Sequence, residues 1–413
     1  MQSPQIRLLN LPVWQRTLYL LFFTQLVNAI AFSIIFPFFP LYVEQLGSAF
    51  GFSIEMLAGL VFSAQAATMM IASPIWGSVA DRFGRKLMIQ RAQFGGAVLL
   101  TLMAYVQNAE QLVLLRAIQG FVTGTAAANN ALIASIIPRK HTGYAMGLMQ
   151  VGMGAGVALG PLIGGILADA FGYQAAFYGT GLLLLISGLL VTFGVHENFN
   201  PKQKKALYQS SLTEEFRHVL SAEGVVPTYS LRFLSQMARM MIIPIAPFII
   251  QTLVIRSFSI NTFIGLVLGI SSGATTLSAI FLGKLGDRIG HRKVLISSAA
   301  AAGLLYLPQY FVTQGWHILT LQALAGVALG GVLPTISALL ACYTDSGEEG
   351  TVYGLDNSIN AAGRAVAPLI GGLVASWFSY RSTFIATSLI LILAVLAASS
   401  LLPKTGRLAH HPT

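Results

Sequence analysis

The chain has 413 residues, of which 55% are hydrophobic and only 9% carry a charged side chain. An ordinary soluble domain has roughly 25% charged residues, so this composition excludes a soluble globular protein, and the low polarity excludes a disordered chain. The net charge of +10 comes from short clusters of Lys and Arg between apolar runs rather than from one solvated face, which argues against a nucleic-acid-binding protein.

Apolar stretches follow one another along the chain, each about as long as the ~20 residues that a helix needs to cross hydrocarbon. The stretch around Arg116 counts as a span only if one buried arginine is tolerated, and an odd number of spans is the alternative. The twelve expected spans are residues 18–43, 56–79, 87–106, 111–136, 144–167, 175–195, 229–253, 263–283, 294–312, 318–342, 352–375 and 383–402.

Lys and Arg are distributed unevenly between alternate loops, and cytoplasmic loops retain such residues. With the N-terminus inside, the outer loops hold only Arg256 and Arg381. Both termini are therefore predicted to be cytoplasmic. The longest polar stretch, residues 196–224, lies halfway along the chain on the same inner side. The predicted domains are residues 1–195 (N-terminal six-helix bundle), 196–226 (cytoplasmic linker) and 227–413 (C-terminal six-helix bundle with a short tail).

The two halves of the chain repeat each other at an offset of about 206 residues. The segment GPLIGGILADAFGYQAAF recurs as APLIGGLVASWFSYRSTF, and the Pro-x-x-Pro that starts at Pro37 recurs at Pro244. Two six-helix halves in parallel orientation are a known transporter architecture, in which the substrate binds between the halves near the membrane midplane. The sequence therefore predicts an all-α membrane protein of two pseudo-symmetric six-helix bundles.

A basic loop after the second span is the clearest repeated motif, and it reads GSVADRFGRK in the first half and GKLGDRIGHRK in the second. Glycine permits a tight turn there, and an aspartate can neutralise a helix N-terminus. We interpret the loop as an inner gate, whose basic residues face either the inner surface or the acidic start of the eleventh helix at Asp345, Glu348 and Glu349. An inner basic loop without a further role is the alternative. The gate residues are Gly77, Asp81, Arg82, Gly84, Arg85, Lys86, Gly283, Asp287, Arg288 and Gly290.

The fourth span contains the motif Leu115-Arg116-Ala-Ile-Gln119-Gly120. An intramembrane arginine costs at least ~2.5 kcal/mol at a helix centre, so Arg116 is a functional candidate. The alternative is that its side chain extends to the outer surface, because it lies about five residues from the helix start. The corresponding position of the second half is Gln322, so this charge belongs to one half.

Small residues crowd the fifth span at four-residue spacing, which allows close approach of helix backbones, and a proline bends the helix. Packing alone is the alternative explanation for such a run. The residues are Gly152, Gly156, Gly160, Pro161, Gly164 and Gly165, with Gly154 between them.

Polar residues on single helix faces mark the expected substrate cavity, since lipid cannot accommodate them. For Arg232 the alternative is a position near the inner surface, to which its side chain extends. Met237, Met240 and Met241 are either adaptable cavity walls or ordinary filler. The cavity candidates are Gln25, Asn28, Arg116, Asn129, Arg232, Gln236, Arg239, Asn357, Asn360 and Arg364.

These motifs resemble those of the major facilitator superfamily, and more narrowly its twelve-helix drug-proton antiporter branch of Mdt-type exporters, over residues 14–402. The resemblance implies the major facilitator fold, and it associates the glycine-rich fifth helix with export. Related tetracycline exporters carry an acid where this chain has Asn28, and an amide takes up no proton at physiological pH. The proton-coupling candidates are therefore Asp356 first, with Arg116 and Asp81; Glu44 and Asp169 are the other available acids.

The leading hypothesis is secondary active export of drugs or other amphipathic molecules, driven by proton influx. The alternatives are export of a specific anionic solute or lipid, because cavity arginines outnumber acids, and a non-transporting sensor on the same scaffold. No nucleophile–base pair or metal-binding motif is visible, and Cys342 is the single cysteine, so an enzyme, a cofactor and a metal site are not expected. The expected partners are small molecules, protons and membrane lipid, for a monomer in the cell inner membrane.

Overall fold

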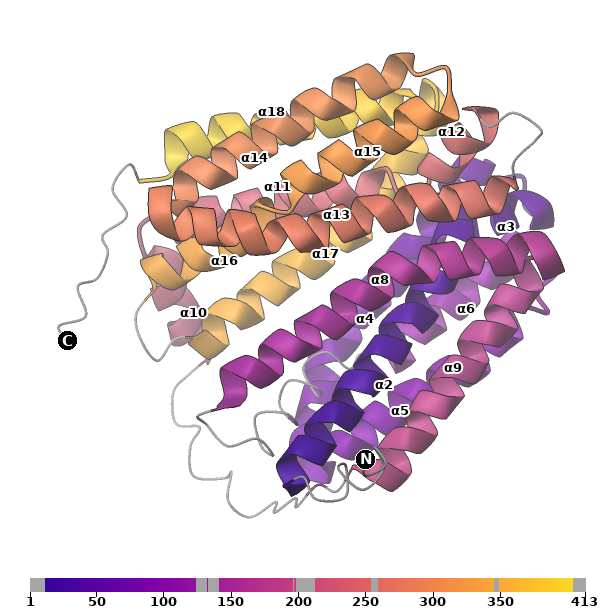
Figure 1. The fold of residues 1–413 in the computed structure, drawn as a ribbon, viewed down its shortest axis with the longest axis horizontal. Coiled ribbons are helices and arrows are strands. Elements are labelled where there is room, and N and C mark those ends of the chain that lie inside the picture. Colours follow the sequence, from indigo (N-terminus) through magenta and orange to yellow (C-terminus); the bar gives the residue numbers. More distant parts are fainter. Residues whose placement is uncertain are drawn as a thin grey trace, which may run out of the picture.

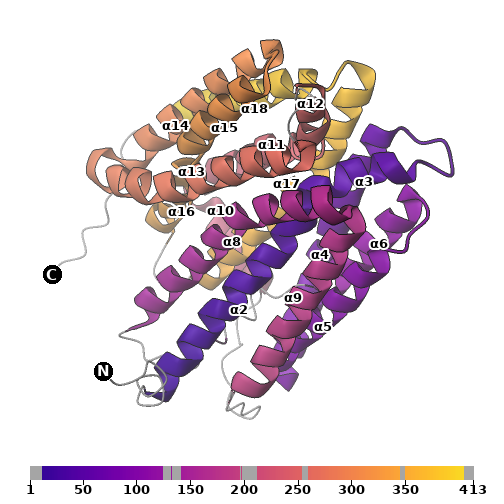
Figure 2. The same cartoon turned by 45° about the vertical axis from the view of Figure 1, so that its right-hand side comes forward.

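A computed structural model describes residues 12–123, 132, 141–195, 197, 212–253, 259–344 and 349–403. The regular elements of these ranges are α-helices with short 3-10 segments, and no strand occurs among the described residues. Two bundles converge at one end and diverge at the other, where α2 begins and α18 ends (Figure 1). The view in Figure 2 shows the same divergence.

The first bundle holds the helices of the first half. Its first span is broken at Pro37, which cannot donate the backbone hydrogen bond that a continuous helix requires. The elements are α2 (Val13–Ile35), η1 (Phe36–Phe38), α3 (Phe39–Leu46), α4 (Ile54–Phe83), α5 (Arg85–Met103), α6 (Ala109–Val122), α8 (Thr142–Phe171) and α9 (Tyr173–Gly194).

The second bundle repeats this order, and its first span is interrupted near Pro244, the counterpart of Pro37. A short helix, α10 (Leu212–Ser221), lies in the predicted linker and packs on α11 and α17. The elements are α11 (Val225–Met241), α12 (Ala246–Leu253), α13 (Ile260–Ile289), α14 (His291–Tyr306), η4 (Leu307–Phe311), α15 (Gly315–Leu329), α16 (Val332–Tyr343), α17 (Glu349–Trp377) and α18 (Ser382–Leu401).

Helix packing follows the sequence repeat. Within the first bundle α2 packs on α8, α4 on α6 and α5 on α9; the second bundle has the corresponding pairs α11–α17, α13–α15 and α14–α18. The two bundles meet through two equivalent pairs, α8 with α13 and α17 with α4. These pairs use the second and fifth spans of each half, so both bundles contribute the same surfaces to the interface.

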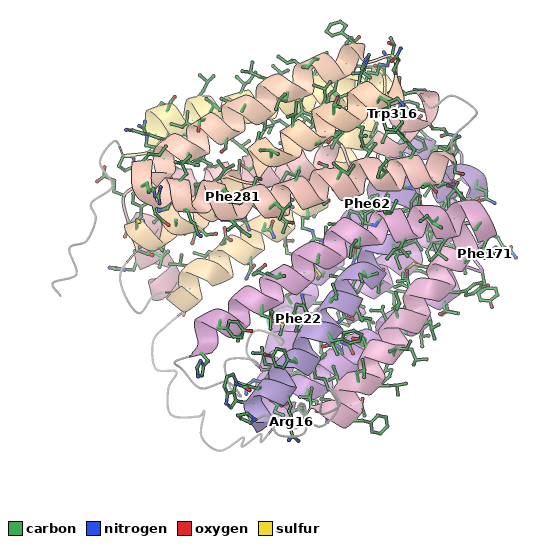
Figure 3. All side chains as sticks on the ribbon, viewed as in Figure 1. Arg16, Phe22, Phe62, Phe171, Phe281 and Trp316 are labelled. Atoms are coloured by element: carbon green, nitrogen blue, oxygen red, sulfur yellow. The ribbon has the colours of Figure 1, made fainter. Side chains whose placement is uncertain are left out.

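Ten helical stretches of the described chain are long and apolar enough to cross a membrane. The two remaining spans are α5, which carries Arg85, Lys86 and Arg91 in its first two turns, and α6, of which 14 residues are described. Large apolar side chains point outward around both bundles, and Phe281 and Phe171 are both more than 70% exposed (Figure 3). The predicted all-α membrane fold is confirmed, with an apolar exterior suited to lipid.

Candidate functional site

A small cavity lies between the bundles. Its walls come from the second and first spans of one bundle and from α11 and α17 of the other, and Phe62 lies where the bundles meet (Figure 3). Two polar side chains, Gln65 and Arg364, face an otherwise apolar lining. The lining residues are Phe36, Phe62, Gln65, Ala66, Met240, Ile243, Arg364 and Pro368.

Arg116 lies behind this cavity rather than in it. Its guanidinium donates to the carbonyl of Val61 (3.1 Å), to Oε1 of Gln119 (2.6 Å) and to Oε1 of Gln65 (2.5 Å). Phe39 covers one face, with its ring centre 4.3 Å from the guanidinium carbon, and the residue is 2% exposed. The side chain therefore does not reach the outer surface, and hydrogen bonds to neutral groups offset its burial.

The other cavity arginines differ in how they are paired. Arg232 forms an ion pair with Asp356, with Nε 3.1 Å from a carboxylate oxygen. Neither Arg364 nor Arg239 is joined by a hydrogen bond or ion pair to any residue of the described ranges. The charges of Arg116 and Arg364 lie close enough to repel each other, as do those of Arg239 and Arg364. The centre of the molecule thus has an excess of positive charge around Arg364.

None of the remaining predicted cavity residues that the structure describes lines this cavity. Gln236 is buried against Gly363 of α17, and Asn28 is half-buried with its side-chain oxygen unpaired. Asn357 is exposed, Asn360 is half-buried, and Gln25 is half-buried. Of Met237, Met240 and Met241, only Met240 lines the cavity. Met241 is fully buried and packs beside Gly371. Asn129 lies outside the described residues.

The glycine-rich helix α8 uses two faces. On one face Gly152, Gly156, Gly160 and Gly164 pack against α2 so closely that an added Cβ at Gly164 would overlap the carbonyl oxygen of Ile34. On the other face the α8 residues that pack against α13 of the second bundle are Gly154, Ala158, Pro161 and Gly165. Small residues therefore hold α8 tightly to both bundles at once.

Polar contacts between the bundles gather at the end away from the start of α2. The carboxylate of Asp169 accepts hydrogen bonds from the backbone and side chains of Asn261 and Thr262 in the first turn of α13, at 2.6 to 3.3 Å. The Tyr173 hydroxyl donates to Asn261 (3.1 Å), and the Tyr380 hydroxyl donates to Glu55 of α4 (3.0 Å). This end of the molecule is closed.

The two tyrosines are related by a repeat offset of 207, and the starts of the helices that they reach, Ile54 and Ile260, by an offset of 206. The closure is asymmetric because Asp169 corresponds to Ser376, which bonds within its own helix to the carbonyl of Leu373. A carboxylate next to the first turn of a helix also interacts favourably with the helix dipole.

The repeated basic loops turn at Gly84 and Gly290, whose φ angles of +96° and +100° favour glycine. Glu197 accepts hydrogen bonds from the backbone N–H groups of Arg85 (3.1 Å) and Lys86 (2.8 Å), so the loop is held within the first bundle. In the second loop Asp287 pairs with His291 at 3.4 Å.

The other gate residues show fewer contacts. Gly77 has open space at its Cβ position, Gly283 lies near Pro334, and Arg288 is exposed. The side chains of Asp81 and Arg82, together with Asp345 and Glu348, lie outside the described part. Their gate contact remains a prediction.

Sequence reasoning missed Gln65, the aromatic residues Phe36 and Phe62, and the closing tyrosines. Gln65 lies four residues after Val61 and so shares with it the face of α4 that meets Arg116. This helical spacing was the available signal. A neutral amide in an apolar helix is a weaker indicator of a functional site than a charged side chain, because its burial costs less free energy.

A family model described as Major Facilitator Superfamily matches residues 21–225 and 228–413. The "Multidrug resistance protein MdtG" of Enterobacter lignolyticus is 35% identical over 396 residues, which are 96% of this chain and 94% of that protein. The protein of the same name from Salmonella dublin is 36% identical over 375 residues, 91% and 92% of the two chains.

Among solved structures, a bacterial homologue of the human lysosomal transporter Spinster, inward-facing and unoccupied, superposes with a TM-score of 0.79 at 16% identity, covering 94% and 98% of the two chains. A mutant of the nucleoside transporter NupG gives 0.79 at 14% identity, covering 95% and 100%. At these identities the likeness concerns the fold, which is the one that the sequence predicts.

Proposed function

Because this chain belongs to the major facilitator superfamily, we propose that it exports drugs or other amphipathic small molecules by alternating access, driven by proton influx. That the chain is a multi-pass membrane transporter rather than an enzyme follows from the family and from relatives of nearly equal length. The direction of transport, the substrates and the coupling ion are the proposed part. The relatives' shared name, multidrug resistance protein, supports it.

The packing of α8 carries the proposal. Its small residues touch α2 on one side and α13 on the other, so the helix closes the bundle interface along its second half. Such a closed interface prevents solutes from leaking through an exporter whose cavity is open only to the opposite side of the membrane. The resemblance of this helix to the exporter signature agrees with that role.

The composition of the cavity lining supports an amphipathic substrate. Aromatic and aliphatic walls from Phe36, Phe62, Met240 and Ile243 suit an apolar body, and two polar side chains suit one polar group. Loops rich in Lys and Arg favour placing the termini, and hence the divergent end of the bundles, in the cytoplasm. The cavity would then collect substrate from the cytoplasm or the inner leaflet of a bacterial inner membrane.

Asp356 is the proposed proton acceptor. It is a buried carboxylate about two turns after the start of α17, and its ion pair with Arg232 joins α17 to α11. Protonation would neutralise the carboxylate and release Arg232, so proton binding would change how α17 packs on α11. A proton could thereby drive a rearrangement of the second bundle.

Transport by the purified protein in proteoliposomes tests the proposal. An inside-out orientation, an imposed pH gradient and a panel of fluorescent dyes should give accumulation that collapses when the gradient is dissipated. Accumulation that persists without the gradient would refute proton coupling, and the absence of any dye transport would refute multidrug export.

A second candidate is export of anionic solutes, and the unpaired Arg364 favours it. Three arginines near the cavity, Arg116, Arg239 and Arg364, have no acidic partner among the described residues. Thermal-shift measurements with anionic antibiotics and lysolipids against cationic dyes would distinguish the candidates, because a ligand stabilises the folded state that binds it.

A further inference from the structure

We propose that Gln65 is the specificity-determining residue of the cavity, and that Arg116 is a positioning residue that acts through Gln65 without touching the substrate. The ligand group recognised by Gln65 and Arg364 is an oxyanion, such as a carboxylate, phosphonate or sulfonate. This inference rests on the proposed function, since it assigns the chemical group by which the exporter recognises its substrate. It also gives Arg116 a role that does not require it to carry a proton.

The orientation of the Gln65 amide follows from the chemistry of arginine. A guanidinium has donors and no acceptor, so Arg116 can bond only the oxygen of the amide, Oε1. The amide nitrogen of Gln65 must then point away from Arg116. Because Gln65 lines the cavity, its Nε2 donors are free to face the ligand, next to the guanidinium of Arg364.

Close packing of α4 against α6 fixes this arrangement. Gly120 lies so close to α4 that a Cβ would overlap the carbonyl oxygen of Gln65 and the Thr68 hydroxyl. Thr68 donates to the carbonyl of Ala117 at 2.7 Å. Arg116 itself bonds both ends of one α4 turn, the Val61 carbonyl and Gln65. The Gln65 amide therefore has little freedom to turn over.

Arg116 cannot be the ligand contact. Its three nitrogens are taken up by Val61, Gln65 and Gln119, the Phe39 ring covers one face, and the residue is 2% exposed. A substrate in the cavity meets Gln65 in front of Arg116. The arginine acts by holding the amide oxygen and so turning the donors toward the cavity.

A cavity whose two polar groups both donate hydrogen bonds requires an acceptor. An oxyanion accepts from Arg364 and from the Gln65 amide at once, and charge-assisted hydrogen bonds are the stronger kind. It would also relieve the repulsion between Arg116 and Arg364. A cationic group would meet only donors and positive charge, so we expect the cavity to discriminate against it.

Two probes of matched shape and opposite charge test the inference: 2-naphthalenesulfonate and 2-naphthyltrimethylammonium, titrated calorimetrically into the purified full-length protein in nanodiscs. We expect the wild type to bind the sulfonate more tightly. Gln65→Leu should weaken sulfonate binding about tenfold or more, since a hydrogen bond to a charged group is lost. Gln65→Glu should reverse the preference, because its carboxylate keeps the bond to Arg116 but offers an acceptor to the cavity.

A matched control is Gln322→Leu, which removes the buried amide at the position corresponding to Arg116. Gln322 bonds Gln309 inside the second bundle and does not line the cavity. We expect its probe affinities to equal those of the wild type. An equal loss of sulfonate binding in the Gln65 and Gln322 variants would overturn the inference.

A double-mutant cycle tests the positioning role of Arg116. Arg116→Lys keeps the positive charge but loses the planar set of hydrogen-bond donors. As a single substitution it should weaken sulfonate binding, and in a protein that already carries Gln65→Leu it should have no further effect. Additive effects would mean that Arg116 acts directly on the ligand and would overturn this role. If Arg116→Lys does not fold, the reversal by Gln65→Glu decides whether Gln65 selects the ligand.

The same variants in the proteoliposome assay separate this inference from the proposed function. Export of both probes with a preference that Gln65→Glu leaves unchanged would refute the inference and leave export standing. Charge-selective binding that Gln65 controls, without any transport, would refute export and leave the binding assignment standing. A wild type that binds neither probe would overturn the oxyanion assignment.

Discussion

Arg116 illustrates how a charge is kept inside a membrane protein. Removing an arginine from water costs several kcal/mol unless its donors are satisfied, and here a backbone carbonyl, two amide oxygens and an aromatic face supply that compensation. The sequence predicts the burial but not the partners, because Val61 and Gln65 are 51 to 55 residues away along the chain. Only the packing of α4 on α6 brings them together.

Asp356 should be required for coupling and not for binding. Asp356→Asn removes the group that would take up the proton but leaves an amide of the same size beside Arg232. We expect substrate exchange across proteoliposomes to continue while accumulation driven by a pH gradient falls at least tenfold. Glu44→Gln, at an exposed position outside the cavity, is the control. Undiminished gradient-driven accumulation in Asp356→Asn would contradict the assignment.

Glu110 should give a measurable pH dependence of stability. The Ser48 hydroxyl and the backbone N–H groups of Ala49 and Phe50 donate to its carboxylate, which lowers the pKa of Glu110 from 4.5 to about 2. Because the folded-state pKa is the lower one, the stabilisation is complete above the unfolded value and is lost as pH falls toward 2.

The matching measurement compares the Tm of the wild type with that of Glu110→Gln in detergent between pH 7 and pH 3. We expect the variant to melt lower at pH 7 and the difference to shrink below about pH 4.5. A difference that does not change over this range would mean that the carboxylate charge contributes nothing.

At the scale of helices, the glycine-rich α8 shows what spacing predicts and what it leaves open. Four-residue spacing predicts one closely packed face, and Gly152, Gly156, Gly160 and Gly164 confirm it against α2. The second face, which packs on α13 of the other bundle, has no comparable signal because its positions include Ala158 and Pro161. A pattern along one helix does not specify which helix approaches it.

Gly164→Ala tests the tight face, with Gly147→Ala on the same helix as its control. A Cβ at Gly164 would overlap the Ile34 carbonyl, so α8 and α2 must move apart at a cost of about 1–3 kcal/mol. No atom lies within 4 Å of a Cβ at Gly147, where alanine should be neutral or slightly stabilising. We expect a lower Tm only for Gly164→Ala, and equal effects would contradict this packing argument.

For the whole molecule, the repeat at an offset of about 206 residues predicts two similar bundles, and the equivalent helix pairs within them confirm this. It does not predict which end is closed, because the same helices must form both the open and the closed arrangement of a transporter. Asp169 and Ser376 occupy equivalent positions, yet only Asp169 reaches across to the other bundle. The asymmetry that closes one end lies in a few polar side chains rather than in the repeat.

Asp169 should therefore set the balance between open and closed forms of this end. Asp169→Ala removes four hydrogen bonds that the first turn of α13 donates to a carboxylate, and such bonds contribute about 1.5–3 kcal/mol each when fully formed. Since the closed form alone makes them, we expect the ratio of open to closed molecules to rise at least about tenfold. Ser376→Ala, the equivalent change in the second bundle, should leave the ratio unchanged because Ser376 bonds only within α17.

The distance across this end can be measured between spin labels attached to cysteines that replace Phe171 and Phe311. Both positions are more than 70% exposed and lie on different bundles, and the native Cys342 is first replaced by Ser. A second, longer distance population in Asp169→Ala and not in Ser376→Ala is the expected result. If the two variants gave the same distance distribution as the parent, the closure would depend on the small-residue packing of α8 and α13 alone. In that case we expect the single variant Gly265→Ala to open this end, because its Cβ would overlap the Pro161 carbonyl.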